Sequence, residues 1–309
     1  MSDPVVAITD LVKVFAGKTR ALDGLDLSLE AGELFGLVGP DGAGKTTLLR
    51  ILAGVLEFDE GEVRLFGRPL NQKGFLPGIG YIPQRFSLYS DLSVQENLNF
   101  FAGVYPPPQK GRRSVEELLE FIGLAPFRHR LAGALSGGMK QKLALLCSLV
   151  PSPQLLLMDE PTVGVDPVSR REFWSLVFEL QKEGVTVLAS TPYMDEAEQF
   201  DRVALLNQGR FLRIGTTEEI KQSVPGHLVR IHCDQPLLAR QLLKGEPGIE
   251  EVELFGEYVH VFVPSLEDGL LRRLEFILGE GGVATSEMEI SPFSIEDVFL
   301  KIASLASAA

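Results

Sequence analysis

Residues 39–47, Gly-Pro-Asp-Gly-Ala-Gly-Lys-Thr-Thr, have the types and spacing of a loop that binds phosphate. They match G-x-x-x-x-G-K-[ST], in which glycines let the backbone curl so that its N–H groups point at phosphate oxygens. Lys45 would reach the β- and γ-phosphates, and the Thr46 hydroxyl would ligate Mg²⁺. The residues expected to contact the nucleotide are Gly39, Pro40, Asp41, Gly42, Ala43, Gly44, Lys45, Thr46 and Thr47.

The sequence on either side of this loop supports the same interpretation. Residues 34–38 are a short apolar run typical of a buried strand, and residues 46–53 open a helix. A glycine-rich turn with a chance Lys-Thr pair would show the same letters. Strand, loop and helix in this order favour a phosphate site instead, so the sequence predicts that the chain binds a nucleoside triphosphate.

A second set of chemical groups follows another predicted strand. Residues 155–158 are Leu-Leu-Leu-Met, and Asp159 and Glu160 come directly after them. Asp159 would hold Mg²⁺ through water, and Glu160 would orient and deprotonate the water that attacks the terminal phosphate. Acidic residues are common at strand ends, so the pair alone is only a moderate signal. The phosphate loop earlier in the chain is what favours a catalytic role for it.

Residues 135–141, Leu-Ser-Gly-Gly-Met-Lys-Gln, open a helix with a serine and two glycines. The N-terminus of a helix presents free N–H groups, so this is a second place shaped for an anion. A helix cap beside a flexible turn would use the same residues. One chain that binds one triphosphate has no evident need of a second anion site, and the position shortly before Asp159 and Glu160 favours a function in the same chemistry.

The composition limits the class of protein. The chain has 309 residues, 45% of them hydrophobic, and a formal net charge of −13. The length suits two domains, and the acidity argues against nucleic acid as a partner, because DNA and RNA binding relies on basic patches. No uncharged apolar run reaches the ~18 residues of a membrane span, and the first residues lack a secretion signal. Cys147 and Cys233 are expected to be buried, in a reducing compartment.

The order of predicted elements indicates an α/β fold over residues 1–222, with helical spacing about residues 85–150. Prolines at 106–108 must end one of these helices. Antiparallel strands are expected first and buried parallel strands later, at residues 5–15, 25–29, 155–158, 185–189 and 203–206. We place the last of these strands at an edge of the sheet.

Residues 225–309 are expected to form a second, smaller domain. They contain six Lys and Arg against fourteen Asp and Glu, so this part holds most of the negative charge. The predicted elements follow the order β-α-β-β-α-β, the α+β arrangement called ferredoxin-like. Sheets of this kind can bind RNA, but the acidity makes RNA a poor candidate here.

The chain resembles the ATP-binding subunits of ABC transporters over residues 5 to about 222. Five motifs occur in the family's order: the phosphate loop, Gln84 after a strand, residues 135–141, the carboxylate strand, and Gly-Val-Asp-Pro at 164–167. Residues 292–299, Pro-Phe-Ser-Ile-Glu-Asp-Val-Phe, are similar to the C-terminal extension of subunits that serve bacterial exporters of the ABC-2 type. The resemblance implies a P-loop NTPase domain with an antiparallel β subdomain and a helical subdomain.

The resemblance also implies the partners and the place of action. The ATPase would energise export of an unidentified substrate (drug-like, lipid or polysaccharide) through a separate ABC-2 type permease. The chain would lie on the cytoplasmic face of the plasma membrane. In the family, two ATP-binding domains meet head to tail, as a homodimer or a heterodimer. Ser136, Gly137 and Gly138 would then contact the γ-phosphate on the partner's loop, and Asp166 would cross the dimer interface.

Further roles are implied within each half of that dimer. Phe15 matches the aromatic residue that stacks on adenine, although an apolar residue in that strand could also be core. Gln84 would contact Mg²⁺, sense the γ-phosphate and pass its state to the permease. Residues 88–97 would touch the permease itself.

One position departs from the family's pattern. Where the family has a histidine that bonds the γ-phosphate, this chain reads Thr191-Pro192-Tyr193. Proline has no side-chain donor and no backbone N–H. A regulatory subunit that binds ATP but hydrolyses it weakly, beside a more active partner, is therefore an alternative to the ordinary energising ATPase. A soluble ABC-type ATPase acting on DNA or ribosomes is a further alternative, but it would carry coiled-coil inserts, zinc motifs or two fused ATPase domains.

Overall fold

The computed structural model describes residues 3–17, 19–70, 77–85, 87–104 and 113–308, and the prolines at 106–108 lie outside these ranges. The chain packs as two compact units, Met1–Thr217 and Glu218–Ala309. The division falls in helix α7 (Thr217–Gln222), a few residues before the interval of 222–225 in which the sequence placed it. Each unit has its own sheets and its own buried core.

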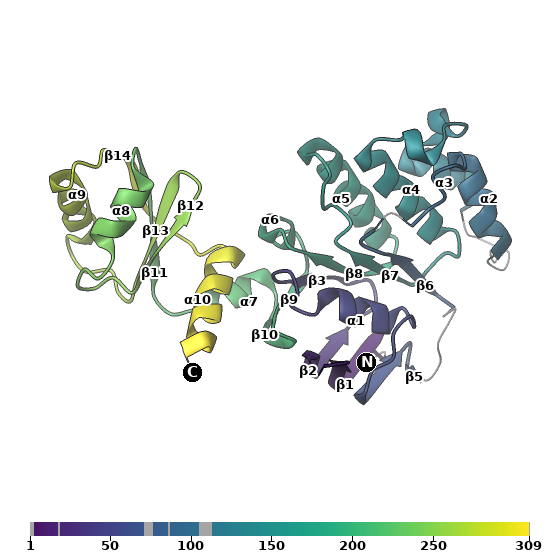
Figure 1. Cartoon of the computed structure of the whole chain (residues 1–309), viewed down its shortest axis with the longest axis horizontal. Coiled ribbons are helices and arrows are strands. Elements are labelled where there is room, and N and C mark those ends of the chain that lie inside the picture. The colour runs from purple at the N-terminus through teal and green to yellow at the C-terminus, as the bar shows by residue number, and fades with distance from the viewer. Residues whose placement is uncertain (1–2, 18, 71–76, 86, 105–112, 309) are drawn as a thin grey trace. The chain divides into compact units, whose positions relative to one another are not determined.

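The first unit has an antiparallel sheet and a mixed sheet within the described residues (Figure 1). The antiparallel sheet has the order β2-β1-β4-β5, with β1 (Val6–Phe15), β2 (Thr19–Leu29), β4 (Glu60–Leu65) and β5 (Arg68–Pro69). The mixed sheet has the order β10-β9-β3-β8-β7-β6, with β3 (Leu34–Val38), β6 (Ile79–Ile82), β7 (Leu155–Asp159), β8 (Thr186–Thr191), β9 (Arg202–Asn207) and β10 (Arg210–Gly215). Its pairs are parallel except for β9 with β10.

The placement of residues 203–206 at a sheet edge was wrong. These residues form the buried middle of β9, which pairs with β3 on one side and with β10 on the other. The edge strand at this side is β10, whose residues are mostly exposed or half-buried and therefore lack the apolar run of a buried strand. A polar edge strand of this kind is hard to recognise from sequence alone.

Helices cover both faces of the mixed sheet. Helix α1 (Lys45–Leu52) lies on the face turned toward the antiparallel sheet, and Leu48, Leu49 and Leu52 join both sheets in one core. Helices on the other side of the sheet include α4 and α5 (Figure 1). The remaining helices of this unit are α2 (Val94–Val104), α3 (Val115–Ile122), α4 (Gly137–Leu149), α5 (Pro167–Lys182) and α6 (Met194–Ala197), with short 3₁₀ turns at Ala125–Phe127 and Ala132–Ala134.

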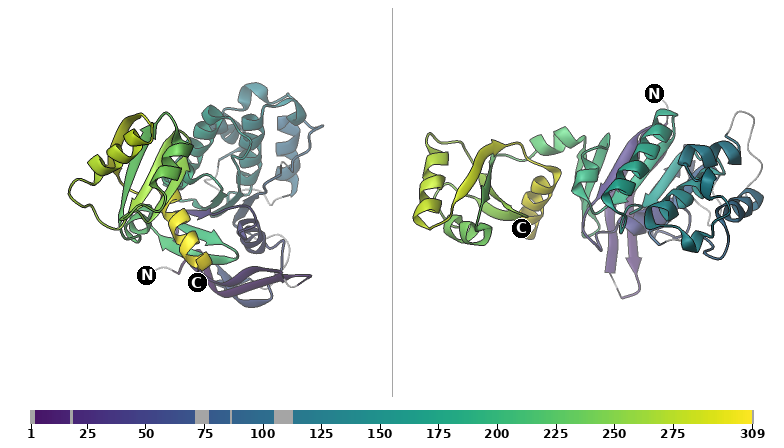
Figure 2. Two further views of the ribbon diagram at one scale, coloured as in Figure 1. Left: turned by 60° about the vertical axis from the view of Figure 1, so that its left-hand side comes forward. Right: turned by 90° about the horizontal axis from the view of Figure 1, so that it is seen from above.

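The second unit has the predicted order β-α-β-β-α-β followed by one more helix. Its elements are β11 (His227–Cys233), α8 (Pro236–Leu243), β12 (Glu251–Phe255), β13 (Tyr258–Val263), α9 (Leu270–Glu280), β14 (Thr285–Ser291) and α10 (Ile295–Ala308). The strands pair antiparallel in the order β12-β13-β11-β14. Helices α8 and α9 lie on one face of the sheet, where Val229, Ile231 and Leu274 belong to a common core, and α10 lies on the other (Figure 2).

Helix α10 is joined to the sheet by a buried pair of polar side chains. Nδ1 of His260 on β13 lies 2.6 Å from Oδ1 of Asp297, and Oδ2 of Asp297 accepts bonds from the backbone N–H and the hydroxyl of Ser294. Burial alone would raise the pKa of Asp297, but hydrogen bonds from His260 and Ser294 outweigh burial, so this pKa lies below its usual value. The carboxylate is therefore ionised and bonded over the whole neutral range.

We predict that Asp297→Asn lowers the free energy of unfolding of the second unit by about 1.5–3 kcal/mol at pH 7, the size of a hydrogen bond to a charged group. The stabilisation from Asp297 is fully present above the unfolded pKa of about 4 and is lost as pH falls through the lowered folded pKa. Urea unfolding followed by circular dichroism at several pH values measures this, with the exposed Asp268→Asn as control. A difference between parent and Asp297→Asn that stays constant down to pH 2 would contradict it.

Candidate active site

The loop of residues 39–44 connects the carboxyl end of β3 to the first turn of α1. Gly42 and Gly44 have φ of 78° and 115°, in the left-handed region that side chains other than glycine rarely adopt. At Gly39, an added Cβ would lie 2.1 Å from the carbonyl oxygen of Leu206 on β9. The glycines of this loop are therefore required by backbone geometry at two positions and by close packing at the third.

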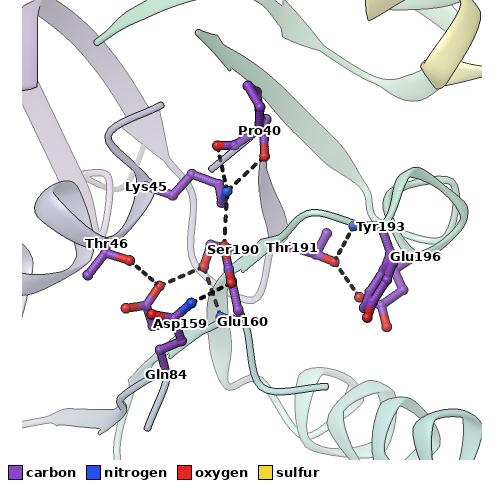
Figure 3. Close-up of polar contacts among 11 residues, drawn as sticks. Pro40, Lys45, Thr46, Gln84, Asp159, Glu160, Ser190, Thr191, Tyr193 and Glu196 are labelled. Carbon is purple, nitrogen blue, oxygen red and sulfur yellow. Dashed lines mark hydrogen bonds and ion pairs between the residues drawn. The ribbon is translucent and has the colours of Figure 1, made fainter. Parts of the chain in front are cut away.

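The ammonium of Lys45 lies at the centre of the site (Figure 3). It donates to the carbonyl oxygens of Gly39 at 2.7 Å and Pro40 at 3.0 Å, and Glu160 Oε1 is 3.0 Å away. Both charged side chains are buried, with Lys45 3% and Glu160 5% exposed. An ammonium has three N–H groups, so these contacts satisfy all of its hydrogen-bonding capacity, and a phosphate oxygen must replace at least one of them.

One carboxylate oxygen of Asp159 accepts hydrogen bonds from two hydroxyl groups. Its Oδ1 accepts bonds from Thr46 Oγ1 and from Ser190 Oγ, each at 3.0 Å. Its Oδ2 is buried and has no hydrogen-bond partner among the described residues. Burial raises the pKa of Asp159 even though Thr46 and Ser190 bond to the carboxylate. An unpartnered carboxylate oxygen beside a threonine hydroxyl is the oxygen-rich donor set that Mg²⁺ prefers, so these residues fit that ion.

Glu160 follows β7 with an unusual backbone conformation. Its φ is 49°, which for a side chain of this size costs on the order of 1–3 kcal/mol and is found most often at functional sites. Its backbone N–H donates to Ser190 Oγ at 3.0 Å, and its Oε2 accepts from Gln84 Nε2 at 2.7 Å. The strained backbone and these two partners turn the carboxylate toward Lys45 (Figure 3).

The phosphate loop and Glu160 border a pocket of about 330 Å³. Its lining consists of Ala21, Asp41, Gly42, Ala43, Gly44, Lys45, Thr46, Thr47, Gln84 and Glu160. The structure thus brings together Lys45, Gln84 and Glu160, which lie far apart in the sequence and were each proposed from a different motif. A cation from the loop and a carboxylate from β7 meet where a terminal phosphate would lie.

The residues of the second anion motif are not part of this pocket's lining. Ser136 caps helix α4 by accepting a bond from the Met139 N–H at 3.3 Å, and both Ser136 and Gly137 are exposed. Gly138 is buried, and an added Cβ there would lie 2.4 Å from the Ser169 side chain, so the close packing requires glycine. The N-terminus of α4 is therefore available to a group from outside this chain.

Asp166 and Phe15 also lie outside the pocket lining. Asp166 is exposed and caps helix α5 by accepting bonds from the backbone N–H groups of Val168 and Ser169, which lower its pKa. Phe15, at the end of β1, is 42% exposed and is thus a surface residue rather than core. Lys13 lies 5.6 Å from the centre of its ring.

The polar residues at the carboxyl end of β8 were not predicted as part of the site. Ser190 bonds to Asp159 and to the backbone of Glu160, and the neighbouring Thr191 donates to Glu196 Oε2 at 2.5 Å. The signal was present, because two hydroxyl residues end an otherwise apolar buried strand. Parallel strands place their carboxyl ends along one edge of a sheet, where such residues meet the groups of neighbouring strands.

Pro192 and Tyr193 follow these residues. The Tyr193 N–H donates to Thr191 Oγ1 at 3.0 Å, so the backbone turns back on itself at Pro192. The Tyr193 ring lies beneath the guanidinium of Arg170, 4.3 Å from ring centre to Cζ. Figure 3 shows Tyr193 beside Glu196, on the side away from Lys45. Tyr193 therefore does not take the place of the expected histidine in this conformation.

A phosphate loop between a parallel strand and a helix, with a carboxylate from a neighbouring strand, defines a nucleotide-binding P-loop ATPase domain. A family model described as ABC transporter matches residues 22–163. The chain is 50% identical over 230 residues to the probable multidrug ABC transporter ATP-binding protein YbhF of Escherichia coli strain K12, covering 73% of this chain and 40% of that protein. It thus spans less than half the length of this relative.

Two further similar proteins are matched over nearly their whole length. The Nod factor export ATP-binding protein I of Rhizobium sp. strain N33 is 33% identical over 307 residues, covering 98% of each chain. An ATP-binding cassette solved as a dimer in a post-hydrolysis state with ADP and phosphate has a TM-score of 0.61 and 25% identity, covering 68% of this chain and 98% of that one. The chain belongs to the ABC transporter family, among its ATP-binding proteins.

We predict that Lys45→Ala weakens ATP binding by roughly tenfold to a hundredfold, because each hydrogen bond to a charged group is worth about 1.5–3 kcal/mol. The substitution also leaves the buried Glu160 without its cation. Titration with ATP in a calorimeter measures the affinity, and Lys244→Ala, an exposed lysine in the second unit, is the control. Equal affinity for parent and Lys45→Ala would show that the loop does not bind phosphate.

Proposed function

We propose that this chain hydrolyses ATP to energise export through a separate membrane-spanning protein. The observation that carries this proposal is Glu160, which is strained, buried and aimed at Lys45 beside the phosphate loop. A carboxylate in this position suits a base that orients and deprotonates an attacking water. The names of the relatives point to export of drugs or Nod factors, and the substrate of this chain is proposed only as drug-like, lipid or polysaccharide.

Each residue of the pocket has a separate role in the proposed reaction. Lys45 exchanges its bonds with the Gly39 and Pro40 carbonyls and Glu160 for bonds to the β- and γ-phosphates. This exchange releases Glu160 Oε1 to accept a bond from water. Thr46 and Asp159 are the residues that would hold Mg²⁺, which when bound neutralises charge on the phosphates. Gln84 donates from Nε2 to Glu160 and so positions the carboxylate, and its amide oxygen would contact the same ion.

A head-to-tail dimer explains the second anion motif. Ser136 and Gly137 are exposed at the N-terminus of α4 and do not line the pocket of their own chain, so they suit the γ-phosphate held by a second copy or a related domain. Asp166, also exposed, would lie at the same interface. The similar cassette solved as a dimer with ADP and phosphate supports this arrangement.

The membrane partner is proposed as an ABC-2 type permease. Across the described residues, none of the helices has both the length and the apolar character needed to span a bilayer. Residues 88–97 precede and enter helix α2, where Tyr89 and Phe100 are exposed and contact each other edge to face at 4.9 Å. We propose this segment as the contact with the permease, with the chain on the cytoplasmic face of the plasma membrane.

Glu160→Gln should keep ATP binding and stop hydrolysis. The amide is nearly the same shape and still bonds to Gln84, but it cannot accept a proton from water. We expect the turnover number to fall at least a hundredfold and ATP to hold the variant as a dimer. Phosphate release and sedimentation with and without ATP measure both effects, and hydrolysis at the parent rate would remove Glu160 as the base.

The absence of a donor at Pro192 favours a second candidate function, in which this chain completes a partner's site while its own site is slow. Neither Pro192 nor the bonded Tyr193 N–H offers a hydrogen bond to the γ-phosphate. A lost hydrogen bond to a charged phosphate is worth ~1.5–3 kcal/mol, so the slow site should lag by roughly tenfold to a hundredfold.

We therefore predict that Pro192→His raises the steady-state ATPase rate of the purified chain about tenfold or more, because the imidazole supplies the missing donor. Phosphate release at saturating ATP is the measurement. Tyr193→Phe is the matched control and should have no effect on rate, since it removes only a hydroxyl turned away from Lys45. A parent chain that is already fast, and unchanged by Pro192→His, would show that the site works without this donor.

A further inference from the structure

A buried carboxylate behind the pocket connects two of the loops that carry its chemistry. Glu196, in helix α6, is only 2% exposed. Its Oε1 accepts a bond from Thr162 Oγ1 at 2.7 Å, and its Oε2 accepts one from Thr191 Oγ1 at 2.5 Å. Both threonines are at least 99% buried. A carboxylate removed from water needs such partners, so the two hydroxyls and Glu196 hold one another in place.

The two threonines belong to segments that end in site residues. Thr162 comes two residues after Glu160, and the Val165 N–H donates to its carbonyl oxygen at 3.1 Å, within the turns that lead to Asp166. Thr191 directly follows Ser190, which bonds to both Asp159 and Glu160. The bond from the Tyr193 N–H to Thr191 Oγ1 adds the turn at Pro192 to the same network. Glu196 therefore joins the end of β7 to the end of β8.

Arg170 extends this connection to helix α5. Its Nη1 lies 3.6 Å from Glu196 Oε1 and 3.9 Å from Asp195 Oδ2, and its guanidinium covers the Tyr193 ring. Its backbone N–H donates to the carbonyl oxygen of Asp166 at 2.9 Å, in the first turn of α5. Nη1 makes no hydrogen bond among the described residues, so this is an ion-pair contact, and it places the first turn of α5 beside the same carboxylate as the loop after Glu160.

We propose that Glu196 is a positioning residue for ATP hydrolysis, an inference that depends on the proposed function of the pocket. It does not line the pocket of the phosphate loop. It makes the loop after Glu160, the turn at Pro192 and the first turn of α5 move as one body, so that Glu160 and Asp166 keep a fixed separation when the dimer closes. In a chain without the histidine donor, this internal connection fixes the turn at Pro192 in place of a bond to the phosphate.

The test separates positioning from binding. Glu196→Ala should leave the ATP affinity within threefold of the parent and lower kcat at least tenfold. Glu196→Gln, which still bonds to at least one threonine, should recover part of the rate. Asp195→Asn removes the neighbouring carboxylate, which is 76% exposed and contacts neither threonine, and should stay within twofold of the parent.

A spectroscopic signal tests the same connection without hydrolysis. Trp174 is the only tryptophan of the chain and lies buried in α5, one turn after Arg170. Mg·ATP should change its fluorescence in the parent, and this change should be lost in Glu196→Ala while ATP still binds. If Glu196→Ala does not fold, Thr162→Val removes one hydroxyl and leaves the carboxylate in place, and Thr162→Ser restores the hydroxyl and should restore the signal.

Three results would overturn the positioning role. They are an unchanged kcat and Trp174 response in Glu196→Ala, a loss of ATP affinity equal to the loss of kcat, and a parent whose Trp174 emission does not respond to Mg·ATP. A parent that binds ATP and never hydrolyses it removes the proposed function instead, while the Trp174 measurement still tests the connection through Glu196.

Discussion

The buried ion pair between Lys45 and Glu160 is the interaction on which the site depends. Both side chains are buried, so each charge must be matched by groups fixed in the fold. The Gly39 and Pro40 carbonyls do this for Lys45, and Gln84 does it for Glu160. The loop after β3 and the end of β7 are thereby held at hydrogen-bonding distance. A site built in this way is already arranged for a triphosphate, whose oxygens can take over the contacts of Lys45 without a large change in the loop.

Strand β8 lies between β3 and β7 in the sheet, and its last two residues bond to different groups. Side chains alternate along a strand, so Ser190 and Thr191 point to opposite sides. Ser190 bonds to Asp159 and Glu160 at the pocket, and Thr191 bonds to Glu196 behind it. Strands β3 and β7 both pair with β8 in parallel. The proposed connection from the pocket to helix α5 therefore passes through the end of this one strand.

The second unit is stabilised by apolar packing on one face of its sheet and by a buried polar pair on the other. Its first helices bury one face of the sheet through aliphatic side chains. On the other face, Asp297 of α10 bonds to His260 of β13, and the ring of Phe293, just before α10, stacks on Phe262 with ring centres 5.9 Å apart. The last helix is thus held by directional bonds as well as by apolar area, which fixes its register on the sheet. Its Asp297 carboxylate remains ionised at neutral pH.

The sequence alone predicted the phosphate loop, the carboxylate strand, the helix that opens at Ser136 and the β-α-β-β-α-β order of the second unit, because each of these shows in the spacing of nearby residues. It placed 203–206 at an edge wrongly, since a polar edge strand such as β10 leaves no periodic apolar signal. Only the tertiary structure decided that Glu160 is strained, that Lys45 is fully bonded, and that Ser190, Thr191 and Glu196 connect the strand ends. The contacts of Glu160 with Ser190 and with Lys45 join residues 30 and 115 positions apart, and the parallel pairing of strands that brings them together is a property of the whole sheet rather than of any one segment.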